Sequence, residues 1–228
     1  MDELVGIISE IKGFLRLQAD LGLREYPKEV ESLLPRGERS LKELEQEALS
    51  CKQCRLWETR NKVVFGAGNP NAGLVLVGEA PGREEDRQGL PFVGRAGLLL
   101  TKILKSIDFE REEVFIANVL KCRPPENRDP IPDEVEACVP FLVEQIAAIK
   151  PTIICALGAF AARTLLKLGP SMSISSLRGV VHDYHGVPLV ATYHPAYLLR
   201  SPNKKRETWE DVKFLRRLYE ELVDREKR

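Results

Sequence analysis

The sequence predicts an α/β fold: a three-layer α/β/α sandwich around a central four-stranded parallel sheet. Continuous runs of Val, Ile and Leu alternate along the chain with segments whose apolar residues recur at helical spacing, the pattern of βαβ units. Strands that are apolar along their whole length are buried on both faces, so helices should cover both sides of the sheet. A chain of 228 residues that is 43% hydrophobic can bury a substantial core of this kind.

The first half of the sheet is expected from two apolar runs. Residues 74–78 (LVLVG) read as a buried strand that ends at Gly78, and residues 114–119 (VFIANV) read as a second strand. Between them, residues 95–107 place leucines and isoleucines at helical spacing, which predicts a crossover helix.

The second half repeats this alternation. A helix over 133–149 begins with two acidic residues, which are favourable at a helix N-terminus, and leads to a strand over 152–156 (TIICA). A glycine then opens a helix over 158–167. A strand over 187–192 (VPLVAT) completes the sheet, and a charged helix over 207–224 follows it.

The first 45 residues are expected to form an appendage. Apolar residues at helical spacing predict a helix over 3–18, and the polar, proline-containing residues 25–40 read as a linker. A short helix over 41–49 then leads into the main domain, residues 46–228.

Charge and hydropathy exclude several protein classes. The 34 basic and 34 acidic residues balance, so a polyanion site must be a local basic patch. No apolar run approaches the ~20 residues that span a bilayer. The first residues are amphipathic and acidic, without the basic start and cleavage site of a secretory signal. We therefore expect a cytoplasmic monomer with no membrane partner.

Five cysteines divide into four candidate ligands and one core residue. Cys51 and Cys54 form a C-x2-C in a polar segment, Cys122 and Cys138 lie in or beside polar loops, and Cys155 lies in an apolar run. In a reducing compartment, such a set indicates a metal rather than disulfides. Four thiolates suit either zinc or an iron–sulfur cluster, and the lack of a second C-x2-C favours the cluster. Four unrelated buried thiols are the alternative.

Polar side chains follow three of the expected strands. Glu79 ends the first strand and precedes a small-residue turn, starting with Ala80, and an exposed Phe92. Asn118 ends the second strand, and His194 follows the last. In an open sheet these loops converge on one crevice. An aromatic face, an amide and an imidazole together predict recognition of a planar base.

Three sequence blocks carry a family resemblance. GEAPGREEDRQGLPFVGRAG, NVLKCRPPENRDP and HPAYLLRSP resemble the signature segments of the family 4 uracil-DNA glycosylases, the iron–sulfur branch of that superfamily, over a match from about Cys51 to the final helix. The resemblance implies hydrolysis of the N-glycosidic bond of deoxyuridine in single- or double-stranded DNA, which leaves an abasic site for base excision repair. It also implies a 4Fe–4S cluster bound by four cysteines: Cys51, Cys54, Cys122 and Cys138.

The resemblance also implies roles for the residues at the strand ends. Phe92 would stack on the flipped uracil, a contact worth about 1–3 kcal/mol. Asn118 would read the uracil edge, and His194 would donate to O2, where negative charge grows. Backbone amides near Ala80 would hold the base. Glu79 would orient water or stabilise the oxocarbenium-like sugar.

A second set of residues would contact the DNA strand. Leu198, four residues after His194, is the candidate wedge that fills the hole left by the flipped base. The basic residues that follow it would track phosphates; these are Arg200, Lys204, Lys205 and Arg206.

The chain departs from the family 1 glycosylases at two positions. Family 1 has the Asp that handles the water where this chain has Ala80, so the nearest acid here is Glu79. Gly82 stands where family 1 has a bulky Tyr that excludes the thymine methyl group, so discrimination against thymine must come from elsewhere. We expect Glu85 and Asp86 to serve only as loop structure.

Two other functions fit the same blocks. One is a uracil trap that bonds covalently to the abasic sugar, but that branch carries a basic, His-containing insertion that KCRPPENRDPIPDE lacks. The other is a non-catalytic DNA-binding module that keeps the fold and the cluster. The complete set of Glu79, Asn118 and His194 favours the enzyme, because a binding module needs no such set.

Overall fold

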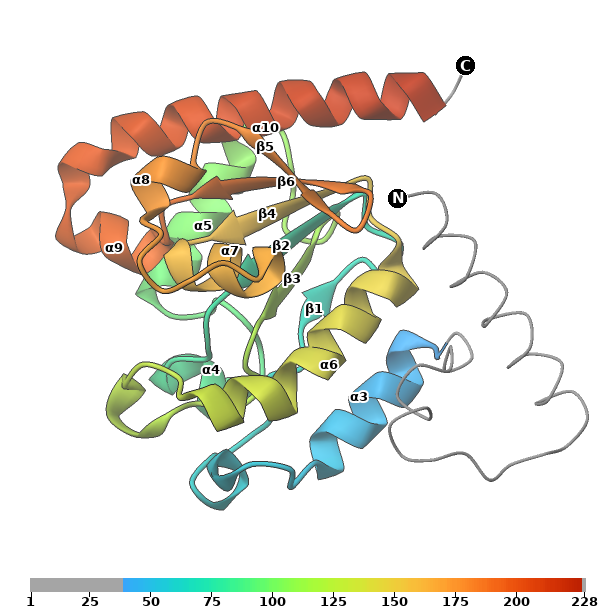
Figure 1. Ribbon diagram of the computed structural model, residues 1–228, viewed down its shortest axis with the longest axis vertical. Helices are drawn as coiled ribbons and strands as arrows, with labels where there is room; N and C mark the ends of the chain where they lie inside the picture. Colours follow the sequence, from blue (N-terminus) through green and yellow to red (C-terminus); the bar gives the residue numbers. More distant parts are fainter. Residues whose placement is uncertain (1–38, 227–228) are drawn as a thin grey trace, which may run out of the picture. The chain divides into compact units, whose positions relative to one another are not determined.

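One six-stranded mixed sheet organises the computed structural model, which describes residues 39–226 (Figure 1). The sheet order is β1-β3-β2-β4-β6-β5, in which β3, β2, β4 and β6 run parallel and β1 and β5 are antiparallel edges. The strands are β1 (Ala67–Gly68), β2 (Leu74–Gly78), β3 (Phe115–Asn118), β4 (Ile153–Leu157), β5 (Val181–Tyr184) and β6 (Val187–Thr192).

The mixed α/β class is confirmed, but the sheet is wider than the four strands expected. The two additional strands are edges that carry little sequence signal. β1 has only two residues, and β5 (VHDY) is polar and largely exposed, so neither produces an apolar run.

The helices agree with most of the expected segments. Within the described residues they are α3 (Leu41–Ser50), α4 (Arg83–Gln88), α5 (Arg95–Lys105), α6 (Pro132–Ile149), α7 (Ala159–Leu166), α8 (Ile174–Leu177), α9 (Pro195–Arg200) and α10 (Lys205–Glu226). Local signals explain their starts. Ser40 and Glu43 form a capping box at α3, and α6 begins with Pro132 followed by two acids.

Helices cover both faces of the sheet (Figure 1). Alternate residues of β2 point to opposite sides, so Val75 and Val77 join one buried cluster with residues of α3, α6 and α7. Leu74 and Leu76 join the other cluster, with residues of α5 and α10. All five residues of β2 are buried, which is why the strand reads as a continuous apolar run.

Two expected loops are helices. Residues 83–88 form α4, because three acids in the first turn favour its N-terminus and Gly89 ends it in a left-handed conformation. Residues 195–200 form α9, which begins with Pro195 directly after His194. The expectation that Glu85 and Asp86 lie in a loop is therefore wrong.

Asp86 has a structural task that the sequence did not indicate. Its side chain is 1% exposed and accepts hydrogen bonds from the backbone and side-chain amides of Asn61 and from the backbone amide of Lys62. It therefore ties the segment that follows the C-x2-C motif to α4.

The expected N-terminal helix over 3–18 lies outside the described residues, as does most of the linker. The compact unit that the structure describes starts at Ser40. The division of the chain into an appendage and a main domain stays a prediction. Between residues 39 and 226, no helix combines the length and the apolarity needed to cross a bilayer.

Candidate active site

The strand ends meet as the sequence predicts. Gly78, the last residue of β2, lies directly opposite Asn118, the last residue of β3, in the parallel register. β6 ends at Thr192, two residues before His194. The side chains after these strands therefore gather at the carboxyl edge of the sheet.

The side-chain amide of Asn118 is buried and has no hydrogen-bond partner among the described residues. The side chain is 1% exposed. Among the buried side-chain atoms of the described residues, those without a hydrogen-bond partner are both amide atoms of Asn118 and one guanidinium nitrogen of Arg111. An unpaired buried amide costs about 1–3 kcal/mol per group, so this side chain favours any ligand that can pair with it.

Gly78 makes room for the two side chains around it. A Cβ atom placed there would collide with Oδ1 of Asn118 and lie 2.6 Å from Cζ of Phe92. The Asn118 amide and the Phe92 ring therefore occupy the space that a side chain at Gly78 would need.

Phe92 is held in an uncommon conformation. Its φ is 51°, in the left-handed region that non-glycine residues rarely occupy. Gly97 of α5 permits this path, because a Cβ there would collide with the backbone of Phe92. The ring is 6% exposed and its centroid lies 5.6 Å from that of His194. The expectation that Phe92 is exposed is wrong, since the ring packs inside the site.

Glu85 shapes the site, which the sequence did not indicate. Its Oε1 accepts hydrogen bonds from the backbone amides of Val93 and Gly94, both at 2.9 Å, and so fixes the loop that carries Phe92. Its Oε2 lies 2.8 Å from the position that a Cβ at Gly82 would occupy. The carboxylate therefore fills the space beside the glycine. The sequence signal that could have indicated this arrangement is Gly82, which lacks a side chain and so leaves space for the carboxylate.

His194 is held as a neutral imidazole of defined tautomer. Its Nδ1 accepts a hydrogen bond from the backbone amide of Ala196 at 3.1 Å, so the proton is on Nε2. The pKa of His194 is lowered to about 4, mainly by burial and also by the positive charge of Arg200, while the negative charge of Glu85 opposes them. Near neutral pH this side chain is an uncharged donor through Nε2.

Glu79 lies at the end of β2 and is half-buried. Burial raises its pKa, the negative charge of Asp129 adds to this effect, and the positive charge of Arg163 opposes it. Ala80, in the same turn, packs against the buried cluster on the α6 side of the sheet.

The four candidate ligand cysteines share one cavity. Cys51 and Cys54 follow α3, Cys122 follows β3, and Cys138 lies on α6. The cavity walls also include two cations, Arg60 and Lys121. Cys155 lies apart from them in β4, where it is 1% exposed and burial raises its pKa to about 12. Its assignment to the core is confirmed.

Four thiols around one cavity are a donor set that suits an iron–sulfur cluster. No three His, Cys, Asp or Glu side chains in residues 39–226 are gathered closely enough to hold one metal ion. A cluster of several iron atoms needs its thiols around a larger body, and four cysteines around one cavity meet that need. Hydrogen bonds to sulfur are already in place. Arg60 Nη1 donates to Cys122 Sγ and the Lys121 backbone amide donates to Cys138 Sγ, both at 3.2 Å.

Comparison with known proteins assigns the family. A model of the uracil DNA glycosylase superfamily matches residues 65–216. A type-4 uracil-DNA glycosylase of Archaeoglobus fulgidus is 47% identical over 180 residues, which cover 76% of this chain and 90% of the relative. The chain belongs to the type-4 uracil-DNA glycosylases. The type-4 enzymes of Sulfurisphaera tokodaii and Thermotoga maritima are 46% and 47% identical, over 78% and 71% of this chain and 84% and 85% of theirs.

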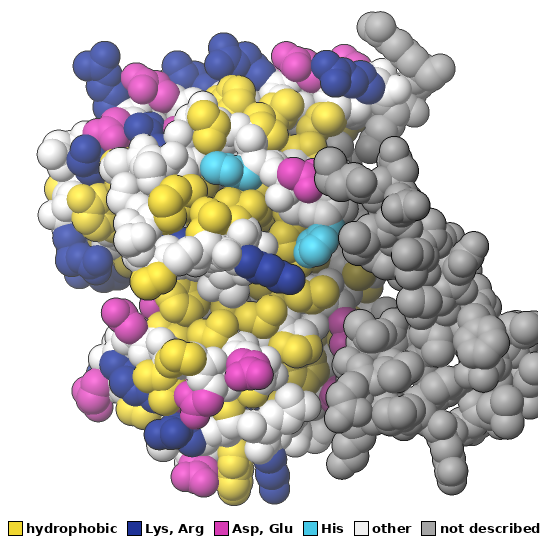
Figure 2. All heavy atoms as spheres, viewed as in Figure 1, with side chains coloured by type: hydrophobic (Ala, Val, Ile, Leu, Met, Phe, Trp, Pro, Cys, Tyr) yellow, Lys and Arg dark blue, Asp and Glu magenta, His cyan; other side chains and the backbone are white. Residues whose placement is uncertain are grey.

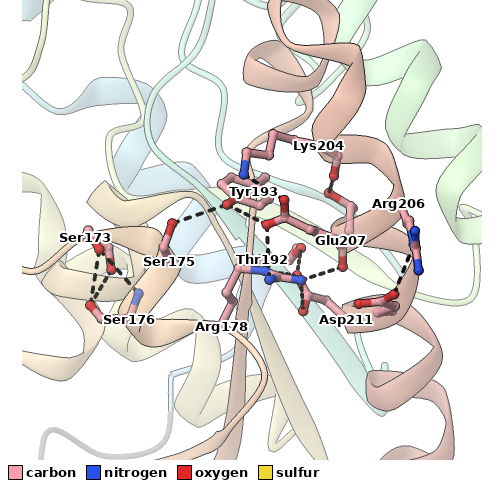
Figure 3. Close-up of polar contacts among 12 residues, drawn as sticks. Ser173, Ser175, Ser176, Arg178, Thr192, Tyr193, Lys204, Arg206, Glu207 and Asp211 are labelled. Atoms are coloured by element: carbon pink, nitrogen blue, oxygen red, sulfur yellow. Dashed lines mark hydrogen bonds and ion pairs between the residues drawn. The ribbon is translucent and has the colours of Figure 1, made fainter.

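In this type-4 glycosylase, a polar network holds the strand that leads to His194 (Figure 3). Arg178 binds both carboxylate oxygens of Asp211 on α10 at 2.9 Å, and Thr192 donates to the same carboxylate at 2.7 Å. Tyr193 donates to Glu207 of α10 at 2.9 Å. The end of β6 is thereby fixed to α10, and the backbone at His194 with it.

Leu198, the expected wedge, is 1% exposed in the free protein, so as a wedge it would have to leave this buried position. It lines an apolar groove with Trp209 and Val212 of α10. The neighbouring side chains of α9 are the accessible ones, with Tyr197 at 36% and Leu199 at 37% exposure. The spacing of four residues between His194 and Leu198 does not determine which face of α9 points towards solvent.

The expected phosphate contacts differ in availability. Arg200, Lys205 and Arg206 are exposed, and Arg206 lies 3.6 Å from Glu210, whereas Lys204 is half-buried and paired with Glu207 at 2.6 Å. Over the face drawn in Figure 2, basic and acidic side chains are interspersed, in keeping with a net charge of zero.

Proposed function

We propose that this protein is a monofunctional uracil-DNA glycosylase that hydrolyses the N-glycosidic bond of deoxyuridine, releases uracil and leaves an abasic site. The observation that carries the proposal is the buried, unpartnered amide of Asn118 beside the rings of Phe92 and His194. The names of the type-4 relatives support the same activity.

The Asn118 amide suits the edge of uracil. It offers one donor and one acceptor, which complement uracil O4 and N3–H and mismatch the amino group of cytosine. A base that leaves these atoms unpaired forgoes about 1–3 kcal/mol for each. Stacking on Phe92 adds about 1–3 kcal/mol without regard to base identity. Specificity therefore comes from Asn118, and general affinity from Phe92.

Glu85 is the candidate for excluding thymine. Its carboxylate fills the space beside Gly82, the position where family 1 glycosylases have the Tyr that excludes the methyl group. A methyl group directed at an ionised carboxylate would have to displace it or desolvate it. The loop that carries Phe92 also depends on this carboxylate, so Glu85 links shape selection to stacking.

Bond cleavage requires stabilisation of opposite charges on base and sugar. As the C1′–N1 bond breaks, its electrons move onto uracil, and the Nε2–H of His194 donates to the O2 atom where they collect. Such a donor contributes about 3–4 kcal/mol. The Glu79 carboxylate stabilises the positive sugar or orients the water that adds to C1′, and the proton which that water loses leaves through Glu79 or the departing base.

A 4Fe–4S cluster bound by Cys51, Cys54, Cys122 and Cys138 would have a structural role, since the glycosidic bond needs no redox chemistry. It would order the loops around the C-x2-C motif and before α6. Replacing Cys122 with Ala should then lower the yield of folded protein together with the visible absorbance. A stable, active variant without iron would contradict a structural cluster.

DNA reaches the site across α9 and the start of α10. Arg200, Lys205 and Arg206 are the exposed cations for phosphate contacts, and Lys204 would need to leave Glu207 to join them. Leu198 stays the candidate wedge that the resemblance implies, and the exposed Tyr197 and Leu199 beside it are further candidates.

The decisive experiment uses a labelled oligonucleotide with one deoxyuridine, followed by alkali, with a matched thymine strand as control. A cut at uracil alone would establish the glycosylase. An uncut strand with the cluster intact would instead support a binding module. A protein–DNA band that survives SDS and heat would indicate covalent capture.

A further inference from the structure

Lys121 is a charged residue buried between the two sites. It lies three residues after Asn118 and one before Cys122, and its side chain is 2% exposed. An ammonium group without solvent is costly unless its partners compensate for the lost hydration. The partners of this lysine therefore indicate what the position is for.

The ammonium bridges the base-reading strand and a helix. Its Nζ donates to the backbone carbonyl oxygen of Asn118 at 2.8 Å and to Oε1 of Gln145 at 2.5 Å. Gln145 is fully buried on α6, and its Nε2 donates to the carbonyl of Phe65 at 2.9 Å. The main chain at Asn118 is thus anchored to α6 through a single side chain.

The same residue forms part of the cysteine cavity. Its backbone amide donates to Cys138 Sγ at 3.2 Å, and the residue lines the cavity with all four cysteines. Thiolates at this site would attract the buried ammonium, because charges interact strongly where water is excluded. Its backbone amide therefore contacts the ligand set while its ammonium contacts the residue that reads the base.

We propose that Lys121 is a positioning residue that couples the cysteine site to base recognition by fixing the direction in which the Asn118 amide points. The inference rests on the proposed function. The carbonyl that the ammonium holds belongs to Asn118 itself, so removal of the ammonium frees the peptide from which the reading amide extends. A small displacement of an aligned group is enough to slow a reaction by about 100-fold.

A purely structural lysine would behave differently. Its loss would reduce the amount of folded, iron-loaded protein, but each loaded molecule would bind uracil and turn over as before. A positioning lysine affects the loaded molecules, and does so only while there is an amide at residue 118 to position.

The test is a double-mutant cycle between Lys121→Met and Asn118→Ala. Methionine keeps most of the length of lysine without its charge. Turnover of the deoxyuridine oligonucleotide is measured per iron-loaded molecule, and the affinity for free uracil by calorimetry. In the wild-type background, Lys121→Met should lower kcat and uracil affinity by about 10–100-fold. In the Asn118→Ala background, the further loss should be at most about twofold.

Arg60→Met is the matched control. It removes a guanidinium that lines the same cavity and donates to Cys122 Sγ at 3.2 Å, and that has no bond to Asn118. Any loss that it causes should be the same factor in both backgrounds.

Equal losses from Lys121→Met in both backgrounds would overturn the proposal. If Lys121→Met does not fold or load iron, Gln145→Met takes its place in the cycle, because it removes one partner of the ammonium but keeps the charge. Independence of Gln145→Met from Asn118→Ala would equally overturn it. A wild-type protein that does not cut at uracil would refute the proposed function itself, which the cycle does not decide.

Discussion

Acid should destabilise this protein through His194. The native imidazole has a pKa of about 4, whereas the ordinary value is 6.5. Below pH 6.5 the unfolded chain binds a proton at this position and the native protein does not, so the stabilisation is complete above pH 6.5 and is lost as the pH falls towards 4.

The size of this effect follows from the two pKa values. At 1.36 kcal/mol per pKa unit, the difference between 6.5 and about 4 corresponds to roughly 3 kcal/mol in the free energy of unfolding. The ring is only half-buried, so solvent screening reduces this figure, and we expect roughly 2 kcal/mol to be lost by pH 4.5.

His194→Asn isolates the contribution. Asparagine is a favourable N-cap residue, so it can keep the start of α9 while it removes the titrating ring. Urea unfolding at pH 7.5, 5.5 and 4.5 should show the wild type losing roughly 2 kcal/mol more than this variant. His185→Asn removes an exposed imidazole from a left-handed position that asparagine tolerates, and serves as the control. Parallel pH curves for wild type and His194→Asn would refute the lowered pKa of His194 in the native protein.

Three further predictions concern other parts of the site. Gly78→Ala should reduce uracil excision at least about 100-fold, because its Cβ would displace the Asn118 amide; a normal rate in the oligonucleotide assay would contradict this. Glu85→Ala should raise the ratio of thymine to uracil excision at least about tenfold in a T:G duplex, whereas Glu85→Gln, which keeps the volume, should not. Arg178→Met should lower the free energy of unfolding by about 3 kcal/mol, because it leaves the buried carboxylate of Asp211 without its cation; a thermal melt checks this.

The sequence predicts the centre of the fold well and its periphery poorly. β2, β4 and β6 are apolar because they are buried on both faces, and this burial produces the apolar runs by which the sequence predicts them. The edge strand β5 is polar and largely exposed, so it has no apolar run. The helix α9 has only six residues, which are too few to show helical periodicity, so its segment reads as a loop.

The candidate site divides along similar lines. Strand ends place Asn118 and His194 reliably, because register in a parallel sheet brings such positions to one edge. The outward face of α9 and the part played by Glu85 depend on packing between segments far apart in the sequence, which no local pattern encodes. The buried position of Leu198 and the missed contacts of Glu85 both arise from this cause.

The unpaired amide of Asn118 lowers the free energy of unfolding of the free protein, because a buried polar group without a partner is costly. A small apolar residue in place of Asn118 would remove this cost and raise the stability of the protein, but it would also remove the amide on which the proposed recognition depends. Under the proposed function, free uracil would also pair with this amide, so the released product would stabilise the protein and compete with the next damaged base. Under the proposed function, one side chain therefore raises the rate of uracil excision and lowers the stability of the free protein.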